Sequence, residues 1–402
     1  MGLNDTPNAE RVHIGIFGSR NAGKSSIINA VTGQKTSIVS DVPGTTTDSV
    51  SKAMELLPIG PVLLTDTPGY DDEGILGDMR VAIAKERLEQ TDIALLVVDG
   101  NEGMSEKDRQ AESVLIEKAI PYIVVYNKLD LADESDDASV FGNGEIVGKA
   151  GKQVNVSALT GEGIEELKKM IGEFEHIVCR THNRLVADYI NPGEYVLLVI
   201  PIDDAAPKGR LILPEQQAIR DILDTDAIAI EVKENRVRKT IDELGVKPSL
   251  VITDSQVFGK VAKEVPEDIR LTSFSILMAR YKGFLDIAVK GVRAIDNLKE
   301  GDKVLICEGC THHRQCDDIG TVKIPALLRK YCGCNVEFDT TAGMGFVDNL
   351  QQYSLVIHCG GCMLSVKEVN RRMRLIDNFG VPVTNYGTAI AYMNGILDRC
   401  LI

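Results

Sequence analysis

Short apolar runs alternate with amphipathic segments along the first 175 residues of the chain. This alternation is typical of a parallel β-sheet whose strands are joined by crossover helices. The pattern predicts strands at 13–17, 61–65, 93–98, 122–126 and 154–156, and helices at 25–31, 79–90, 107–118 and 164–174. The segment 130–151 is acidic and contains glycine, so we expect an exposed excursion before the last strand.

Two further α/β series follow the first. Beyond a polar connector at 176–184, the pattern predicts strands at 195–200, 227–231 and 250–253, and helices at 215–224, 235–244 and 256–263. Pro266 marks another boundary, after which it predicts strands at 304–307, 335–339, 355–358 and 383–385, and helices at 324–330, 367–379 and 388–397. We therefore predict an α/β protein with three domains, at 1–176, 184–263 and 266–402, of which the middle one is a structural or dimerisation module.

A glycine-containing loop joins the first predicted strand to the first predicted helix. Its sequence, Gly18-Ser19-Arg20-Asn21-Ala22-Gly23-Lys24-Ser25, fits the G-x-x-x-x-G-K-S pattern. In such a loop backbone N–H groups and the helix N-terminus surround the β-phosphate of a nucleotide. Lys24 can reach the β- and γ-phosphates, the Ser25 hydroxyl can bind Mg²⁺, and we count Ser26 with the loop.

Three more motifs follow predicted strands in the order that a P-loop GTPase requires. In Asp66-Thr67-Pro68-Gly69, Asp66 can hold Mg²⁺ through water and the Gly69 N–H can contact the γ-phosphate. In Asn127-Lys128-Leu129-Asp130, the Asp130 carboxylate can accept two hydrogen bonds from guanine, which adenine cannot offer. Ser157-Ala158-Leu159 can complete the base pocket. The first domain is therefore predicted to be a P-loop GTPase domain, followed by two smaller α/β domains.

The excess of acidic over basic residues limits which molecules the chain can bind. The net charge is −15, and residues 1–176 hold 30 of the 59 acidic residues but only 16 of the 44 basic ones. Such a surface repels phosphate backbones, and aromatic residues are only 5% of the chain, so we expect no nucleic-acid partner. No apolar run is long enough to span a membrane, and the N-terminus is polar. We therefore expect a cytoplasmic protein that does not associate with a membrane.

Eight of the nine cysteines lie between residues 307 and 400. Cys307-Glu308-Gly309-Cys310 and Cys359-Gly360-Gly361-Cys362 are paired C-x-x-C turns, which suit tetrahedral Zn²⁺. Read with the histidines, Cys310-Thr311-His312 and His358-Cys359-Gly360-Gly361-Cys362 instead suit an iron–sulfur cluster with three thiolates and one open position.

The segment Pro43-Gly44-Thr45-Thr46-Thr47-Asp48 resembles the switch segment of the Era and TrmE group of GTPases. The resemblance implies that Thr46 closes over Mg²⁺, with Thr45 or Thr47 as alternatives after a slip of one residue. In that group an asparagine at the position of Asn21 marks members that bind K⁺. Because Tyr70 stands where signalling GTPases carry a water-orienting glutamine, we expect slow intrinsic hydrolysis that depends on K⁺, on dimerised G domains or on a partner.

The C-x-H…H-C-x-x-C pattern, joined to such a GTPase, resembles the FeFe-hydrogenase maturation GTPases, the HydF family, along the whole chain. The resemblance implies that Cys310, Cys359 and Cys362 bind a 4Fe-4S cluster, and that His312 and His358 are candidates for a fourth ligand or for neighbours of the ligands. The remaining cysteines of this region match nothing in the family pattern: Cys307, Cys316, Cys332, Cys334 and Cys400. Of these, Cys332-Gly333-Cys334 could be redox-active or bind adventitious metal.

The resemblance also implies a function. The chain would be a dimeric scaffold and carrier that uses GTP as a timing signal. It would receive iron with CO, CN⁻ and dithiolate ligands from two radical-SAM maturases, build the 2Fe precursor of the H-cluster, and deliver it to apo FeFe-hydrogenase. The alternatives are an RNA-handling GTPase of the Era or TrmE type, and a GTPase with a structural zinc site.

Overall fold

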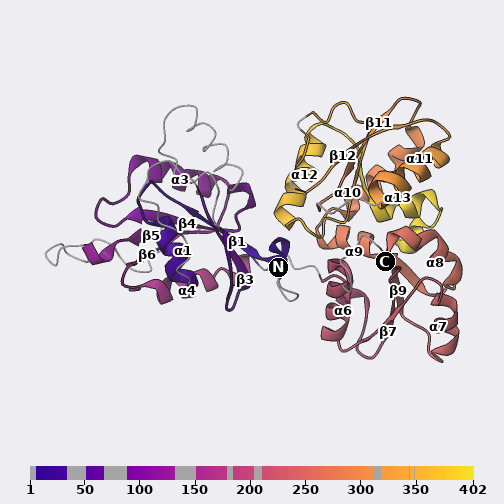
Figure 1. The fold of residues 1–402 in the computed structure, drawn as a ribbon, viewed down its shortest axis with the longest axis horizontal. Coiled ribbons are helices and arrows are strands. Elements are labelled where there is room, and N and C mark those ends of the chain that lie inside the picture. The colour runs from indigo at the N-terminus through magenta and orange to yellow at the C-terminus, as the bar shows by residue number, and fades with distance from the viewer. Residues whose placement is uncertain are drawn as a thin grey trace. The chain divides into compact units, whose positions relative to one another are not determined.

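The computed structural model describes residues 6–33, 51–67, 88–131, 151–178, 184–202, 211–310, 318–343, 345–347 and 349–402. The chain forms two compact units, Met1–Thr181 and His182–Ile402 (Figure 1). Both units combine β-sheets with helices, so the predicted α/β class is confirmed. No helix in the described ranges is both long and apolar enough to cross a membrane.

The first unit contains a six-stranded sheet with the order β2-β3-β1-β4-β5-β6. All neighbouring strands are parallel except β2, which runs antiparallel to β3. The strands are β1 (Val12–Phe17), β2 (Ser51–Leu56), β3 (Gly60–Asp66), β4 (Ile93–Asp99), β5 (Tyr122–Asn127) and β6 (Gly151–Asn155). The helices are α1 (Lys24–Thr32), α3 (Glu106–Glu117), α4 (Ile164–Gly172) and α5 (Glu175–Val178).

The apolar pattern located this sheet well. Strands β1, β3, β4 and β5 lie where it predicted them. Most residues of these strands are buried, so each strand appears in the sequence as an apolar run. It missed the edge strand β2, whose exposed positions alternate with buried ones, and it placed β6 three residues too late. Most of the predicted helix 79–90 and of the predicted excursion 130–151 lies outside the described residues.

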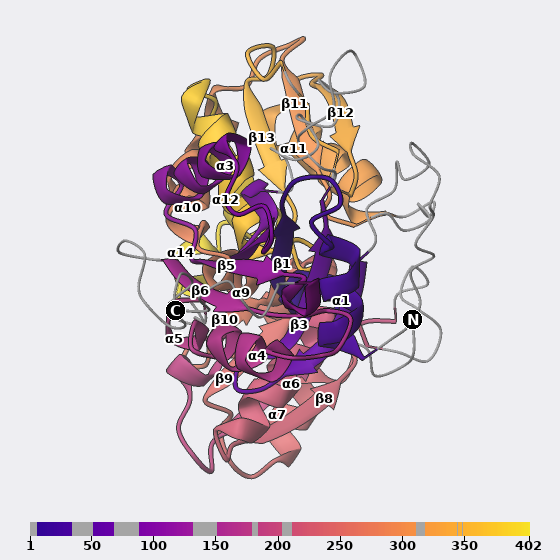
Figure 2. The same cartoon turned by 90° about the vertical axis from the view of Figure 1, so that its left-hand side faces the viewer.

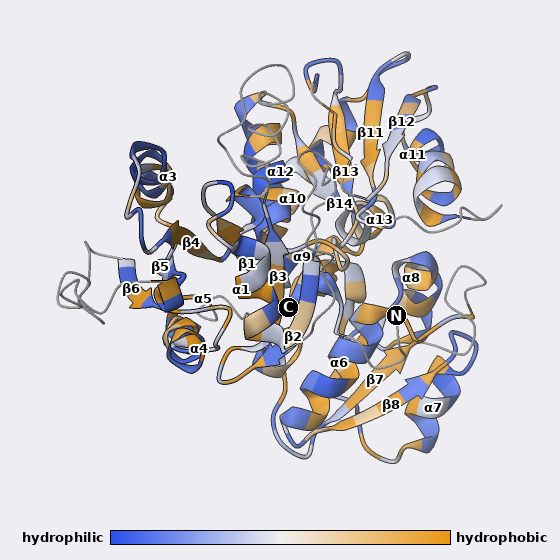
Figure 3. Cartoon of the chain, turned by 60° about the vertical axis from the view of Figure 1, so that its left-hand side comes forward, coloured by the Kyte–Doolittle hydropathy of each residue, from blue (hydrophilic) through white to orange (hydrophobic). Residues whose placement is uncertain are grey.

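The second unit begins with a four-stranded parallel sheet of order β10-β9-β7-β8, here called the middle sheet. Its strands are β7 (Tyr195–Val199), β8 (Ile228–Val232), β9 (Leu250–Thr253) and β10 (Arg270–Ser273). Its helices are α6 (Leu213–Asp224), α7 (Val237–Glu243), α8 (Phe258–Glu264) and α9 (Phe274–Tyr281). Hydropathy colouring shows apolar strands beneath helices that alternate between polar and apolar residues (Figure 3).

A second four-stranded parallel sheet follows, with the order β12-β11-β13-β14, here called the C-terminal sheet. Figure 2 shows β11, β12 and β13 side by side. Its strands are β11 (Lys303–Cys307), β12 (Glu337–Thr341), β13 (Leu355–His358) and β14 (Val383–Asn385). Its helices are α10 (Leu285–Gly291), α11 (Ile324–Cys332), α12 (Val366–Asn378), α13 (Tyr386–Met393) and α14 (Leu397–Cys400), with a π-helical turn at Ile319–Lys323.

The predicted boundary between residues 263 and 266 does not separate the two sheets. Strand β10 lies beyond it and pairs with β9, so the middle sheet continues to Ser273. One hydrophobic cluster also contains residues of both sheets, such as Val251 and Val304. The pattern missed this because β10 has only four residues, which carry too little periodicity to be recognised.

Both sheets of the second unit follow the same path. In the C-terminal sheet the chain passes from β11 to β12 on one side, and then crosses to β13 and β14 on the other. The direction of the path therefore reverses between β11 and β13. In open parallel sheets the crevice at the carboxyl ends of two such strands is the usual place for a ligand.

Candidate functional site

The glycine-rich loop of the first unit runs from the end of β1 to the start of α1. Gly18, Asn21 and Gly23 all have positive φ angles, which turn the loop tightly. A Cβ atom on Gly18 would lie 2.2 Å from the Val97 carbonyl oxygen, so only glycine fits there. The loop therefore has the backbone geometry that lets N–H groups point inward at the N-terminus of α1.

Three predicted nucleotide-site side chains come together beside this loop. The Lys24 Nζ donates to the carbonyl oxygens of Gly18 and Ser19, both at 2.9 Å. The Ser25 hydroxyl donates to Asp66 Oδ2 at 2.6 Å, which joins the helix start to the end of β3. Burial raises the pKa of Asp66, against the lowering influence of Ser25 and Lys24.

The second carboxylate oxygen of Asp66 lacks a hydrogen-bond donor in the described part of the chain. Asp66 Oδ1 is buried and has no hydrogen-bond partner among the described residues. A buried, unpaired carboxylate oxygen is costly unless a cation or water meets it. Asp66 and Ser25 supply oxygen atoms, the ligands that Mg²⁺ prefers, so the donor set fits that ion.

The base-recognition motifs are also brought together. Asn127 donates from Nδ2 to the Ala22 carbonyl at 3.0 Å and accepts the Ala158 N–H at Oδ1, also at 3.0 Å. It thus links the phosphate loop to the last motif. The Ser157 hydroxyl donates to Asp130, while the Leu159 side chain is 84% exposed. Ring-shaped ligands could stack against such an exposed apolar side chain.

The other residues predicted to bind the nucleotide differ in burial and in their contacts. Arg20 is exposed, Ser26 is half-buried, and the buried Thr67 donates its hydroxyl to the Ile16 carbonyl at 2.6 Å. Lys128 forms an ion pair with Asp99. Thr46, Pro68 and Gly69 lie outside the described residues, as do Thr45, Thr47 and Tyr70.

Sequence reasoning missed two acidic residues of this site. Asp99 ends β4 and pairs with Lys128, and that pairing with other contacts lowers its pKa against the effect of burial. Asp108 forms a capping box with Ser105 at the start of α3 and also accepts the Ser19 hydroxyl at 3.0 Å. The capping pattern was visible in the sequence, but its contact with the phosphate loop was not.

In the second unit, the predicted cysteine ligands lie at the carboxyl edge of the C-terminal sheet. Cys307 and His358 are partners in the register of β11 and β13, which are adjacent and parallel. Cys310 follows β11 and Cys359 and Cys362 follow β13, so all three leave the sheet at the same edge. This is the point where the path of the chain reverses direction.

The Cys359 thiol accepts two backbone hydrogen bonds. Its Sγ accepts the backbone N–H of Gly309 at 3.1 Å and that of Gly361 at 3.3 Å. One N–H comes from each cysteine turn, so this sulfur joins the two motifs. Backbone N–H groups aimed at sulfur favour the thiolate and are a means of tuning iron–sulfur centres.

All three predicted ligand thiols have a raised pKa. Burial raises the pKa of Cys359 and raises that of Cys362 to about 12. Burial also raises the pKa of Cys310, helped by the neighbouring Cys359 and Cys362. Within the described ranges, no group of three or more His, Cys, Asp or Glu side chains is already gathered as a metal site. Because their pKa values are raised, the three thiols would have to lose their protons to bind a metal as thiolates.

His358 is buried with both ring nitrogens engaged. Its Nδ1 lies 2.7 Å from the Cys359 carbonyl oxygen, which can only accept, so Nδ1 carries the proton. Its Nε2 faces the Arg372 guanidinium at 3.5 Å, and the ring meets Phe284 edge-on at 5.7 Å. Burial lowers the pKa of His358 to about 4, so the ring is neutral. His312 lies outside the described residues.

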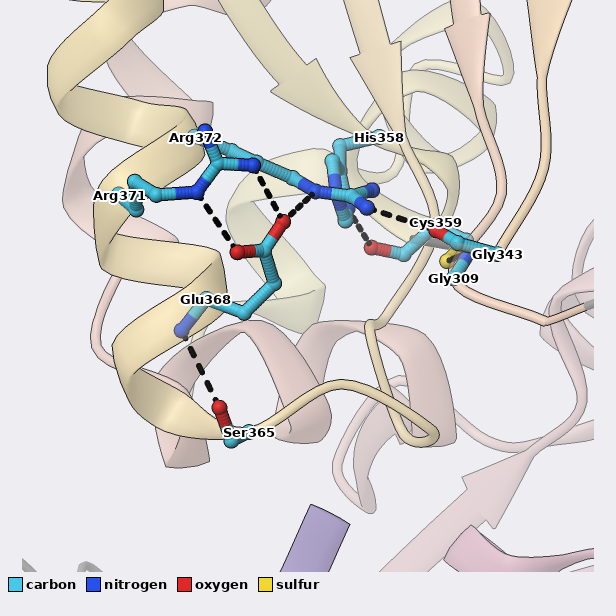
Figure 4. Close-up of polar contacts among 8 residues, drawn as sticks. All are labelled: Gly309, Gly343, His358, Cys359, Ser365, Glu368, Arg371 and Arg372. Carbon is cyan, nitrogen blue, oxygen red and sulfur yellow. Dashed lines mark hydrogen bonds and ion pairs between the residues drawn. The ribbon is translucent and has the colours of Figure 1, made fainter. Parts of the chain in front are cut away.

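A buried network of charges lies behind His358 (Figure 4). On α12, Glu368 accepts two hydrogen bonds from Arg371, at 2.7 and 2.9 Å, and one from Arg372 at 2.8 Å. Arg372 also donates to the Gly343 carbonyl at 2.7 Å. The sequence shows Glu368 and Arg372 four residues apart, a spacing equally common on exposed helix faces, so it gave no sign that the pair is buried.

Of the other cysteines in the described ranges, Cys307 lies at this edge as the last residue of β11, and its carbonyl accepts the Cys359 N–H at 2.9 Å. Cys307 and Cys400 are fully buried, and burial raises the pKa of each to about 12. Cys332 and Cys334 contact each other and donate to the carbonyl oxygens of Ile295 and Leu298, at 3.5 and 3.7 Å. Cys316 lies outside the described residues.

Comparison with known proteins separates the two units. Residues 13–128 match the family model of the 50S ribosome-binding GTPase. Residues 185–283 match the hydrogen maturase F dimerization domain, and residues 286–402 match its tetramerization domain. Together these two models match more than half of the chain. The chain belongs to the hydrogen maturase F (HydF) family.

Other relatives resemble the GTPase part of this HydF-family chain. The tRNA modification GTPase MnmE of Nitrosomonas europaea is 34% identical over 160 residues, which are 40% of this chain and 34% of that protein. GTPase Der of Kosmotoga olearia is 30% identical over 216 residues, which are 52% of this chain and 48% of that protein. The chain thus spans between a third and a half of the curated relatives it matches.

Solved structures of GTPases also resemble part of this chain. The G domain of the T. maritima FeoB iron transporter is 26% identical and covers 41% of this chain and 99% of that domain, with a TM-score of 0.31. The family matches confirm the predicted GTPase domain with its P-loop fold and support oligomerisation. They describe residues 286–402, which hold the predicted cluster ligands, as a tetramerization domain, and they link the chain to hydrogenase maturation.

Proposed function

We propose that this chain is a GTP-hydrolysing scaffold that assembles the 2Fe precursor of the FeFe-hydrogenase H-cluster and delivers it to the apo-hydrogenase. The observation that carries the proposal is the convergence of Cys310, Cys359 and Cys362 at one sheet edge in a chain of the HydF family. The precursor, with its CO and CN⁻ ligands, is cargo that arrives from two radical-SAM maturases and leaves again.

The resident cofactor at this edge is a 4Fe-4S cluster held by the three cysteines. Two observations support it: the Cys359 sulfur accepts N–H groups from both cysteine turns, and Cys359 and Cys362 lie near enough to Cys310 to act on its pKa. A cluster with three thiolates leaves one iron without a protein sulfur, where cargo can attach and detach. His358 is a poor candidate for that position, because both its nitrogens already face protein groups.

At the other site, GTP binds with Mg²⁺. Ser25 and the unpaired Asp66 Oδ1 support a magnesium position, to which the predicted Thr46 would be added. Lys24, with the predicted Gly69 N–H, stabilises the charge that develops on the phosphates. Asp130 selects guanine, since buried polar groups left unpaired by adenine penalise the wrong base.

Hydrolysis is slow and activated by K⁺ bound beside Asn21, which is exposed at the turn of the phosphate loop with a φ of 64°. The cation would neutralise charge as an arginine finger does. The test is GTP turnover in K⁺ and in Na⁺ at equal ionic strength. We expect clearly faster turnover in K⁺, and the difference should disappear in Asn21→Ala. Equal rates in both salts would contradict the role of the cation.

GTP acts as a timing signal that changes the affinity for partner proteins. The family-model names support a dimer and a larger assembly. The measurement is binding of apo-hydrogenase and of each maturase with GTP or GDP present. Unchanged affinities and unchanged cargo transfer would contradict this gating.

The decisive experiment is anaerobic reconstitution with ferrous iron and sulfide, followed by electron paramagnetic resonance of the reduced full-length protein. We expect a 4Fe-4S signal in the wild type and its loss in Cys310→Ser. Cys334→Ser is the matched control, because that cysteine is similarly half-buried but lies away from the edge. A colourless protein that binds zinc without sulfide would instead favour a structural zinc site, and a colourless protein that binds RNA would favour an RNA-handling GTPase.

A further inference from the structure

A positive charge is buried beside the thiol edge of the C-terminal sheet. Arg372 is the largest of the fully buried side chains in the described part of the chain. Its guanidinium reaches Glu368, the His358 ring and the Gly343 carbonyl, as Figure 4 shows. It also lies over the Phe346 ring, 5.2 Å from the centroid. A buried charge is tolerated only where an opposite charge or hydrogen bonds compensate for the lost water.

The pairing leaves an excess of positive charge. Glu368 is the shared acceptor of Arg371 and Arg372, so one carboxylate faces two guanidinium groups. Although burial acts to raise it, the pKa of Glu368 is lowered by these two arginines, so the carboxylate is ionised. The Arg371 side chain is 27% exposed and is partly screened by water, whereas that of Arg372 is 0% exposed.

The excess charge faces the cysteine turn. Arg372 contacts His358, which in turn binds the Cys359 carbonyl, so the guanidinium supports the turn one residue from the thiol. Its charge acts to lower the pKa of Cys359, against the larger effect of burial. On the Cys362 side, the buried Lys282 donates to the Leu364 carbonyl at 2.7 Å and its charge acts on Cys362 in the same direction.

The Cys310 side of the edge has the opposite sign. Glu308 and Asp318 are both buried, and both act to raise the pKa of Cys310 after burial itself and the other thiols. An anionic group held by the three cysteines would therefore lie between cations at the Cys359–Cys362 turn and carboxylates at Cys310. Fixed charges in a water-poor site act more strongly than they would in solvent.

We propose that Arg372, partly balanced by Glu368, is a positioning residue that holds the Cys359 turn and sets the reduction potential of the iron–sulfur cluster. This inference rests on the proposed function, because it requires a cluster at this edge. Each thiolate brings negative charge, and one-electron reduction adds another negative charge to the cluster. A buried cation stabilises the reduced form more than the oxidised form and so raises the potential.

The two partners of the ion pair should act in opposite directions. Arg372→Gln removes the cation, so the potential should become more negative. Glu368→Gln keeps the cation and removes its counter-charge, so the potential should become more positive. General damage to the fold would not produce shifts of opposite sign. Arg371→Gln is the matched control: the residue binds the same carboxylate, but its side chain is 27% exposed, whereas that of Arg372 is fully buried.

The test is a redox titration of the reconstituted full-length protein, followed by electron paramagnetic resonance. At the midpoint potential of the wild type, we expect about tenfold less reduced than oxidised cluster in Arg372→Gln, which corresponds to a shift of about 59 mV. Glu368→Gln should shift the other way and Arg371→Gln should shift least. Arg372→Lys should restore most of the potential, because the charge is kept. Shifts of the same sign in both partners, or no shift in either, would overturn the inference.

A second variant guards against misfolding. If Arg372→Gln yields no folded protein, Lys282→Met removes a buried cation from the other side of the turn and should also shift the potential negatively. Iron and sulfide analysis of each variant distinguishes loss of the cluster from a change in its reduction potential. A wild type that holds no cluster would remove the proposed function itself, whereas a wild-type cluster with an unmoved potential in these variants would remove only the role of Arg372.

Discussion

The middle sheet and the C-terminal sheet of the second unit follow the same path through four parallel strands. Their orders, β10-β9-β7-β8 and β14-β13-β11-β12, correspond strand by strand. In both, the direction of the path reverses between the first and third strands. Each sheet therefore has the same kind of crevice at its carboxyl edge.

The residues that follow the third strand differ completely. After β9 come Asp254 and Ser255, and the Asp254 carboxylate accepts the Gln256 N–H at 2.7 Å to start a short 3₁₀ turn. After β13 comes the Cys359–Cys362 turn, whose sulfur accepts backbone N–H groups. The comparison teaches that topology provides the crevice and that the loop residues decide whether it has any chemistry.

The largest effect is expected where iron binding at the carboxyl edge of the C-terminal sheet is compared with that of the middle sheet. Cys359→Ser should remove most of the iron, on the order of a tenfold loss or more, because an alcohol does not replace a thiolate as a soft ligand. Asp254→Asn, at the matching position of the middle sheet, should leave iron content unchanged. Iron and sulfide analysis after anaerobic reconstitution measures both, and equal losses would mean that the middle edge also takes part.

The next effect tests whether the nucleotide site and the cysteine edge are independent. Lys24→Ala should weaken GTP binding by on the order of a hundredfold, because the phosphates lose their cation. The cluster content should stay at the wild-type level, since the two units have separate cores. Calorimetric titration with a GTP analogue measures the first and iron analysis the second. Parallel loss of both would show that the units depend on each other for folding.

The third strand ends at His358 in β13 and at Thr253 in β9, and of these two side chains only that of His358 gains a proton in acid. Because the folded pKa of His358 is about 4 and its usual value is 6.5, the unfolded chain binds a proton more readily. Stability from the neutral ring is present above pH 6.5 and is lost as the pH falls towards 4, by roughly 3 kcal/mol in all. Urea titrations of the full chain followed by circular dichroism should show this loss, and His358→Gln should flatten it. A slope unchanged by the substitution would contradict the buried neutral ring.

The smallest effect compares the caps of the helices that follow the two crevices. Ser365 accepts the Glu368 N–H at 3.2 Å at the start of the 13-residue α12. Ser365→Ala should lower the free energy of unfolding by about 1 kcal/mol. Asp254→Ala should cost less, because its three-residue turn leads into the seven-residue α8, which is shorter than α12. Thermal melts of both variants check the order, and the reverse order would show that α12 does not need its cap.

The sequence predicted the parts whose signal is local. Strands such as β4 and β5 were found because an unbroken apolar run is sufficient to identify a buried strand. The phosphate loop was found because a fixed spacing of glycines and a lysine reflects one backbone geometry. The edge strand β2 was missed because a lysine, Lys52, occupies one of its buried positions, so the sequence hides the alternation of exposed and buried residues. The four-residue β10 was missed because it is too short to carry a recognisable period.

By itself, then, the sequence determined the α/β class, the GTPase motifs and the family, all of which depend on residues close together in the chain. Only the tertiary structure decided that Glu368 and Arg372 are buried behind Cys359, that both nitrogens of His358 are occupied, and that one core joins the two sheets of the second unit. The physical reason is that burial and charge pairing depend on which distant segments pack together. A pattern of neighbouring residues does not record that packing.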